Sequence, residues 1–145
     1  MRKAIVAITK NGILLYKPVD GATNAVVIEE FLNEMVNVLP ENIVIVMDNL
    51  RFHHGYRVHQ RASSHSLITI EYLPPYSPEL NPIEEFFHME KSLYRKKNRP
   101  IARSREIMRQ RVASVLESFL GKNLSGLYYH MRQNLAKAYA GQSFV

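Results

Sequence analysis

The sequence predicts a mixed α/β fold in which helices pack against a sheet, and three observations support this. First, two short apolar runs meet at Asn11-Gly12, a strong signal for an antiparallel hairpin. Second, residues 43–47 (IVIVM) form an apolar run rich in β-branched residues, which is typical of a strand buried on both faces. Third, apolar residues recur at helical spacing between and after these runs. The order hairpin, helix, strand predicts a mixed sheet with a helix packed on it.

Composition limits the class of protein. The chain has 145 residues, of which 46% are hydrophobic and 10% aromatic, enough for one folded domain with a sizeable core. It has no apolar run long enough to span a bilayer and no signal peptide. It also has no cysteine, which excludes disulfides and zinc–thiolate sites. We therefore expect an intracellular protein without a membrane partner, in the cytoplasm and nucleoid of a bacterium or the nucleus of a eukaryote.

The first half of the chain predicts three strands and a helix. Lys3–Thr9 and Gly12–Val19 are the expected hairpin strands. A helix follows with Thr23 or Asn24 as its N-cap, and Pro40 ends it before the strand at residues 43–47. The apolar face of that helix consists of Ile28, Phe31, Leu32, Met35, Val36 and Leu39.

The middle of the chain predicts a second strand and a long helix. Residues 51–64 are polar and predict a short surface helix, and Leu67–Tyr72 predicts a strand parallel to residues 43–47. Three prolines between residues 74 and 78 favour an extended, rigid loop. Asn81 and Pro82 then suit the N-cap and first turn of a helix.

The last third of the chain predicts two more amphipathic helices. The break at residues 98–100 separates them from the preceding helix, and Gly121 is expected to end the first of the two. We therefore predict a domain over residues 1–97 and a helical extension over residues 98–145 that packs on it.

Two acids stand at the ends of predicted elements. Asp48 follows the buried strand, where open α/β sheets bind their ligands, and Glu84 lies near the start of a helix. Such carboxylates can converge on a divalent cation, because Mg²⁺ binds oxygen ligands, usually one or two carboxylates with substrate phosphates. Taken singly, Asp48 is equally explained as an acid that caps a turn, and Glu84 as an acid favoured by the helix dipole.

The two motifs around these acids resemble a known family. MDNLRFHH followed by EYLPPYSPELNPIEEFF closely resembles the mariner-type DDE transposases and their bacterial insertion-sequence relatives, and the likeness covers roughly residues 1–97. The resemblance implies a ribonuclease-H-like (retroviral-integrase-like) fold and DNA strand cleavage and strand transfer. It implies two divalent ions, Mg²⁺ or Mn²⁺, with Asp48 as a bridging ligand and Glu84 as a terminal one. PPYSPELNPIE argues against another nuclease of the same superfold.

Further residues are candidates for supporting roles. In the family-like pattern, Asn49 orients the strand end and His54 supports the metal site or contacts DNA; a purely structural role is the alternative for both. Net charge is +6, and nine of the nineteen basic residues lie between Lys91 and Arg111. The predicted DNA contacts are Lys91, Arg95, Lys96, Lys97, Arg99 and Arg103. A solvated helix face followed by a linker is the alternative.

The sequence departs from the family in one respect. A DDE enzyme needs a first aspartate, and the chain contains only Asp20 and Asp48, of which Asp20 is not at the family's catalytic position. The resemblance places that first acid on a central strand before Lys3, so we expect a C-terminal catalytic part without this strand, inactive alone. The expected partners are DNA (transposon ends and target) and an upstream transposase half or a second copy. The alternative is a non-catalytic DNA-binding or dimerisation remnant.

Overall fold

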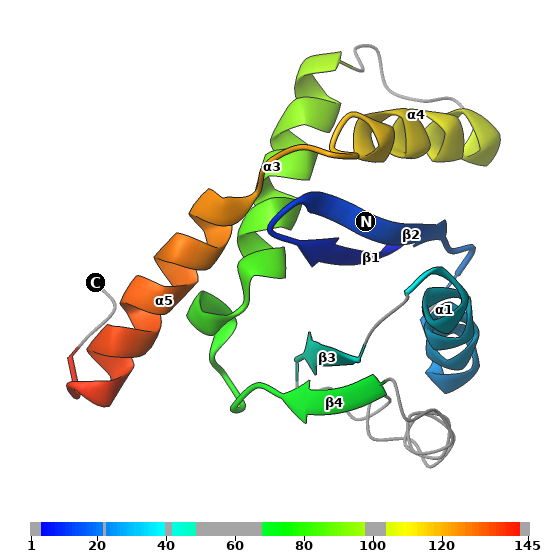
Figure 1. Ribbon diagram of the computed structural model, residues 1–145. Coiled ribbons are helices and arrows are strands. Elements are labelled where there is room, and N and C mark those ends of the chain that lie inside the picture. The colour runs from blue at the N-terminus through cyan, green and yellow to red at the C-terminus, as the bar shows by residue number, and fades with distance from the viewer. Residues whose placement is uncertain (1–3, 22, 40–41, 49–67, 98–103, 143–145) are drawn as a thin grey trace. The chain divides into compact units, whose positions relative to one another are not determined.

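The computed structural model describes residues 4–21, 23–39, 42–48, 68–97 and 104–142 (Figure 1). The chain forms two compact units. The first consists of residues 1–20 and 79–145, and the second of residues 21–78. The predicted domain boundary between residues 97 and 98 stays a prediction.

The first unit is built on the predicted hairpin. Strand β1 (Ala4–Thr9) pairs antiparallel with β2 (Gly12–Pro18). Thr9 lies opposite Gly12, so Lys10 and Asn11 form the turn. Thr9 Oγ1 accepts a hydrogen bond from the Asn11 N–H at 3.1 Å, and Gly12 has a positive φ of 116°. Because a side chain disfavours that φ, glycine at the turn is what allows this hairpin.

Three helices share a core with the hairpin in this unit. A short 3₁₀ turn, η2 (Pro78–Leu80), leads into α3 (Pro82–Lys97), which is followed by α4 (Arg105–Glu117) and α5 (Ser125–Tyr139). Both α4 and α5 contact α3, and α4 also contacts β2 (Figure 1). Ser104 caps α4, since its Oγ accepts a hydrogen bond from the Ile107 N–H at 3.2 Å.

Helix α4 ends earlier than predicted. It stops at Glu117, whereas the sequence places the end at Gly121. The N–H groups of Ser118, Phe119 and Leu120 each donate to the carbonyl three residues earlier, which tightens the chain into successive turns. The apolar spacing therefore continues past the helix, and Phe119 is still buried in the core.

The core of the first unit joins the hairpin to all three helices. Phe86 and Phe119, at 0% and 1% exposure, meet edge to face with ring centroids 5.1 Å apart. The whole cluster consists of Ile13, Phe86, Phe87, Val115, Leu116, Phe119, Leu124 and Leu127. These aromatic and aliphatic contacts fix α3 against the sheet.

The second unit contains α1 (Ala25–Val38) and a parallel strand pair. Of the two predicted caps, Asn24 is the one that caps α1, since its side chain accepts a hydrogen bond from the Val27 N–H at 3.1 Å. Strand β3 (Ile43–Met47) pairs in parallel with β4 (Ile68–Tyr72), which confirms the predicted strand direction. The short helix predicted over residues 51–64 lies outside the described residues.

The prediction that β3 is buried on both faces is wrong. Val44 and Val46 are 61% and 54% exposed, and burial alternates along the strand. Alternation arises because successive side chains point to opposite faces and, in the part of the chain described, only one face of the β3–β4 pair is covered.

The described strands form two separate pairs. Strand β1 pairs with β2 and β3 pairs with β4. The strand that the resemblance places between the two pairs is not among the described residues. None of the helices described is both long and apolar enough to cross a bilayer.

Candidate active site

Asp48 lies at the carboxyl end of the parallel strand pair, as predicted. It directly follows Met47, the last residue of β3, whose partner in β4 is Tyr72. The Met47 carbonyl accepts a hydrogen bond from the Leu73 N–H at 2.8 Å, which extends the ladder to the level of Asp48. The Asp48 side chain is half-buried. Burial raises the pKa of the neighbouring Tyr72, so this phenol remains neutral beside the acid.

Glu84 lies in the first turn of α3, on a capped helix start. Asn81 Oδ1 accepts a hydrogen bond from the Ile83 N–H at 3.4 Å, and the Asn81 carbonyl accepts one from the Glu84 N–H at 3.0 Å. Pro82 is the first helical residue, where its missing N–H costs nothing. The predicted helix start is therefore confirmed. Glu84 is exposed and lies in the first helical turn, a common position for acidic residues.

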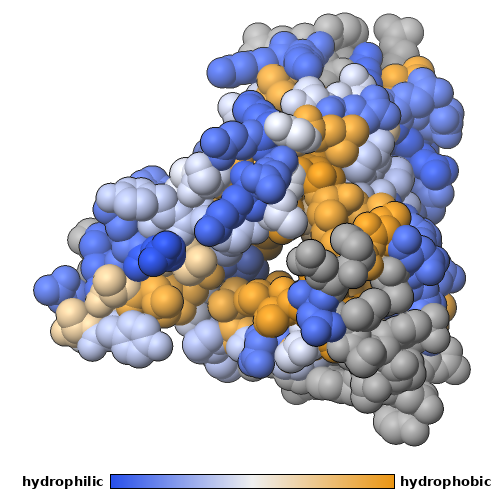
Figure 2. Space-filling view, in the orientation of Figure 1, coloured by the Kyte–Doolittle hydropathy of each residue, from blue (hydrophilic) through white to orange (hydrophobic). Residues whose placement is uncertain are grey.

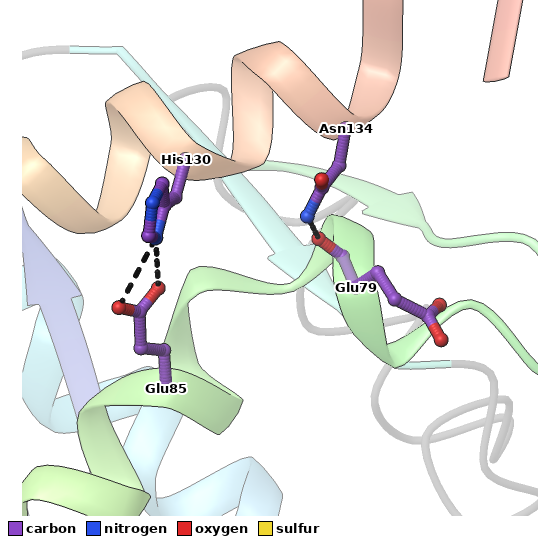
Figure 3. A network of polar contacts seen from close by, with 4 residues as sticks. All are labelled: Glu79, Glu85, His130 and Asn134. Atoms are coloured by element: carbon purple, nitrogen blue, oxygen red, sulfur yellow. Dashed lines mark hydrogen bonds and ion pairs between the residues drawn. The ribbon is translucent and has the colours of Figure 1, made fainter. Parts of the chain in front are cut away.

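Two residues of α5 contact the segment around Glu84 (Figure 3). Asn134 Nδ2 donates to the Glu79 carbonyl at 3.1 Å, and His130 Nδ1 lies 3.4 Å from both carboxylate oxygens of Glu85. Sequence reasoning missed both contacts. Their spacing of four residues places His130 and Asn134 on one face of a helix, but no local pattern shows which segment that face meets.

The metal-binding role of the two acids stays a prediction. Asp48 belongs to the second unit and Glu84 to the first, and each lies at the predicted end of its element. Their oxygen atoms suit a hard cation such as Mg²⁺ or Mn²⁺. Within the described residues, no group of three or more acids and histidines could hold a metal ion. Asn49 and His54 lie outside these residues.

The predicted DNA-binding residues of α3 are exposed. Lys91, Arg95, Lys96 and Lys97 occupy the last two turns of the helix, where the dipole also favours positive charge. Lys91 and Arg95 are four residues apart and therefore share a face. Arg99 and Arg103 lie outside the described residues.

The basic cluster has more acidic neighbours than the sequence suggests. Glu106 is the only acid between residues 91 and 111, yet Arg109 also pairs with Asp20, with 2.9 Å between the guanidinium nitrogen and the carboxylate oxygen. Glu106 itself accepts a hydrogen bond from Gln110 at 3.0 Å. Arg109 is thus engaged within the protein, which leaves the α3 residues as the stronger candidates for DNA contact.

A pocket of about 380 Å³ opens in the first unit beside these basic residues. Its charged lining comes from α3 and consists of Glu90, Lys91 and Arg95, whereas β1 and α4 supply apolar side chains. Glu90 is 8% exposed. Sequence reasoning missed this buried acid, and its place among the apolar residues of α3 was the available signal.

Comparison with known proteins identifies the family. The model of the DDE superfamily endonucleases matches residues 2–108. Among solved structures, the catalytic domain of the Mos1 mariner transposase is 18% identical, with a TM-score of 0.71 over 98% of this chain and 75% of that one. The Mos1 catalytic domain with raltegravir and Mn is 17% identical, with a TM-score of 0.71 over 98% of this chain and 76% of that one. No curated protein matches the chain.

A Mos1 paired-end complex with the left transposon end shows the same fold. It is 18% identical, with a TM-score of 0.73, and the match covers 95% of this chain but only 42% of that one. These likenesses confirm the predicted ribonuclease-H-like α/β fold. Together with the family match, which includes both Asp48 and Glu84, they show that this chain belongs to the DDE superfamily endonucleases and has the fold of a mariner transposase catalytic domain.

Proposed function

We propose that this chain is part of a transposase catalytic domain for metal-dependent DNA strand cleavage and strand transfer. The observation that carries the proposal is the position of its two acids within the family-matched segment. Asp48 ends a parallel strand pair, and Glu84 occupies the capped first turn of a helix. Both sites present carboxylates at defined ends of rigid elements rather than on the faces of helices.

In this proposal Asp48 and Glu84 hold Mg²⁺ or Mn²⁺ together with phosphate oxygens of DNA. When bound, the ions activate the attacking oxygen and stabilise the leaving 3′ oxygen. The protein contributes placement: the β3–β4 ladder fixes Asp48, and Asn81 fixes the turn that carries Glu84. Solved structures of the Mos1 catalytic domain contain Mn in one case and Mg in another, which supports this choice of ions.

DNA is the proposed substrate and partner. The exposed side chains of Lys91, Arg95, Lys96 and Lys97 neutralise phosphates along the last turns of α3, so binding weakens with salt. Mos1 structures that include transposon ends or a strand transfer complex support transposon ends and target DNA as partners. A separate transposase segment that carries the remaining acid completes the site in this proposal. A second copy of the chain is the other proposed protein partner.

The chain alone is proposed not to cleave DNA. It has two aspartates, and Asp20 pairs with Arg109 on the protein's own surface. In this proposal the first aspartate of the three-acid site comes from outside these 145 residues. The second candidate function is a non-catalytic DNA-binding remnant, which the basic residues of α3 favour because phosphate binding needs no metal ion.

Metal binding tests the proposed site. Purified chain is titrated with Mn²⁺ while water-proton relaxation reports the bound ion, and the isosteric variants Asp48→Asn and Glu84→Gln are compared with it. The proposal expects both variants to weaken Mn²⁺ binding, by about tenfold or more because each removes a direct oxygen ligand. Equal affinity in all three proteins overturns the metal site.

DNA assays separate the two candidate functions. Binding of a labelled duplex is measured at several salt concentrations with the native chain and with Lys91→Ala/Arg95→Ala, and nicking of supercoiled plasmid is followed with Mg²⁺ or Mn²⁺. We expect salt-sensitive binding that the double variant weakens, and no nicking. Metal-dependent nicking that Asp48→Asn abolishes would overturn the proposed inactivity. Metal-independent DNA binding together with unchanged Mn²⁺ affinity in the Asp48 and Glu84 variants favours the remnant.

A further inference from the structure

Helix α5 is anchored firmly at its start. The Leu124 N–H donates to the Lys10 carbonyl at 2.8 Å, and the Tyr128 hydroxyl donates to the Ile8 carbonyl at 3.0 Å. Leu124 and Leu127 are buried in the core, at 2% and 6% exposure. The first turn of α5 is thereby fixed to the β1–β2 hairpin.

Beyond its first turn, α5 makes two polar contacts, one with η2 and one with the start of α3. Leu127 is the only buried residue within the helix, whereas Tyr129, Leu135 and Tyr139 are exposed. The surface formed by α5 accordingly carries both hydrophobic and hydrophilic residues (Figure 2). His130 and Asn134, one turn apart on one face, reach Glu85 and Glu79 (Figure 3).

These two contacts lie on either side of Glu84 in the sequence. Asn134 bonds the backbone of Glu79, five residues before Glu84, and His130 meets the side chain of Glu85, the next residue. The backbone between them includes the capped turn at Asn81. A rotation of this turn that moved Glu84 would lengthen at least one of the two contacts.

We propose that His130 and Asn134 are positioning residues that hold the first turn of α3 and, through it, the Glu84 carboxylate. The inference rests on the proposed role of Glu84 as a metal ligand. Metal ligands must keep their geometry within about 0.5 Å, so even weak tethers on a solvent-exposed helix end affect affinity. Because the start of α5 is bonded to the β1–β2 hairpin, the contacts of α5 hold the start of α3 relative to that hairpin.

The effect is local rather than global. The side chains of His130 and Glu85 are 64% and 45% exposed, and such surface pairs add little to overall stability. A merely structural role for α5 would change the stability of the whole unit. The positioning role instead predicts a change confined to residues 79–85 and to metal binding.

Amide hydrogen exchange in the full chain is the first test. The variants are His130→Ala and Asn134→Asp, which replaces the amide donor by a carboxylate of the same shape. Arg132→Ala, an exposed change between them on the same helix, is the control. We expect exchange of the Ile83 and Glu84 amides to rise about twofold to fivefold in the two variants, as for loss of one surface contact. Exchange in β1 and β2 is expected to stay unchanged, and unaltered rates at Ile83 and Glu84 overturn the inference.

Mn²⁺ affinity is the second test. The double variant His130→Ala/Asn134→Asp is expected to weaken binding about twofold to tenfold, less than loss of a group that bonds a metal ligand directly. In a Glu84→Gln background the same double variant is expected to have no further effect. An equal loss in that background overturns the positioning role.

Charge exchange provides the rescue. Glu85→Lys alone is expected to behave like His130→Ala. The double variant Glu85→Lys/His130→Glu is expected to restore both exchange and affinity, because the exchanged basic and acidic side chains form a contact between the same two positions. Failure of the exchanged pair to restore either property overturns the role of this contact. A different result would contradict the proposed function itself. If Glu84→Gln alone leaves Mn²⁺ affinity unchanged, Glu84 is not a metal ligand, and the amide exchange rates do not alter that conclusion.

Discussion

The carboxylate of Asp20 pairs with the guanidinium of Arg109, 2.9 Å away and 89 residues later in the sequence. Asp20 directly follows the buried Val19 at the end of the hairpin, and Arg109 lies on α4, so the pair connects the hairpin to that helix. One of the two aspartates of this endonuclease-family chain is thus part of the protein's surface structure. This is compatible with the sequence-based expectation that Asp20 does not occupy the catalytic position.

The Asp20–Arg109 pair is expected to matter little for stability and not at all for metal binding. Both side chains are exposed, at 62% and 42%, so Asp20→Asn should lower the free energy of unfolding by about 0.2–1 kcal/mol. Urea denaturation measures this change, and Mn²⁺ titration of the same variant is expected to match the native chain. A loss of Mn²⁺ binding as large as that of Asp48→Asn would contradict the assignment and place Asp20 in the metal site.

Gly12 is expected to be essential to the hairpin. Its φ of 116° alone makes Gly12→Ala unfavourable by about 1–3 kcal/mol. The added Cβ would also lie 2.8 Å from the Phe119 carbonyl oxygen, which is closer than a carbon atom can approach without displacing the backbone. Thermal unfolding followed by circular dichroism measures the loss. Gly126→Ala is the matched control, because nothing lies within 4 Å of its Cβ and alanine in α5 is expected to stabilise by up to about 1 kcal/mol. Equal effects at the two glycines would contradict the account.

The Asn81 cap is expected to stabilise the start of α3. Asn81→Ala removes the acceptor of the Ile83 N–H and should cost about 0.5–2 kcal/mol. Asn81→Asp keeps an acceptor oxygen and is expected to remain close to the native stability. Urea denaturation separates the two variants, and exchange of the Ile83 amide shows whether the loss lies at the cap. If alanine and aspartate are equivalent, the side-chain cap contributes nothing.

Tyr128 is expected to make stability depend on alkaline pH. Burial raises the pKa of this phenol above its ordinary value of 10.0. The unfolded chain therefore releases the proton first as pH rises, so the stabilisation is complete below pH 10 and is lost through the higher folded pKa. Tyr128→Phe should reduce the fall in unfolding free energy above pH 10.

The same substitution has an expected cost at neutral pH. Tyr128→Phe removes the hydrogen bond to the Ile8 carbonyl, which is worth about 0.5–1.5 kcal/mol. Denaturation at pH 7 and at pH 11 measures the two effects independently. Tyr16 provides a comparison, because burial and a hydrogen bond to Glu117 also raise its pKa. The corresponding variant is Tyr16→Phe. A pH dependence identical in the native chain and both variants would contradict the assignment.

Local features were predictable from the sequence because neighbouring residues determine them. The turn before Gly12 and the caps at Asn24 and Asn81 each depend on contacts between residues no more than three positions apart. The parallel direction of β3 and β4 was predicted correctly, and the sequence motifs around Asp48 and Glu84 were enough to indicate the family. At the turn and the two caps, one side chain and the backbone within three residues of it are enough to define the local structure.

The contacts between distant segments were decided only by the tertiary structure. The pairing of Arg109 with Asp20, of Asn134 with Glu79, of His130 with Glu85 and of Tyr128 with Ile8 joins residues 45 to 120 positions apart. The exposure of Val44 and Val46 on one face of β3 and the burial of Glu90 also depend on how distant segments pack. Periodicity shows that a face is apolar or polar, but the partner of that face is set by how all the elements fill one core. The sequence by itself determined the elements and the candidate acids, whereas packing of the hairpin with α3, α4 and α5 determined what holds the turn of Glu84.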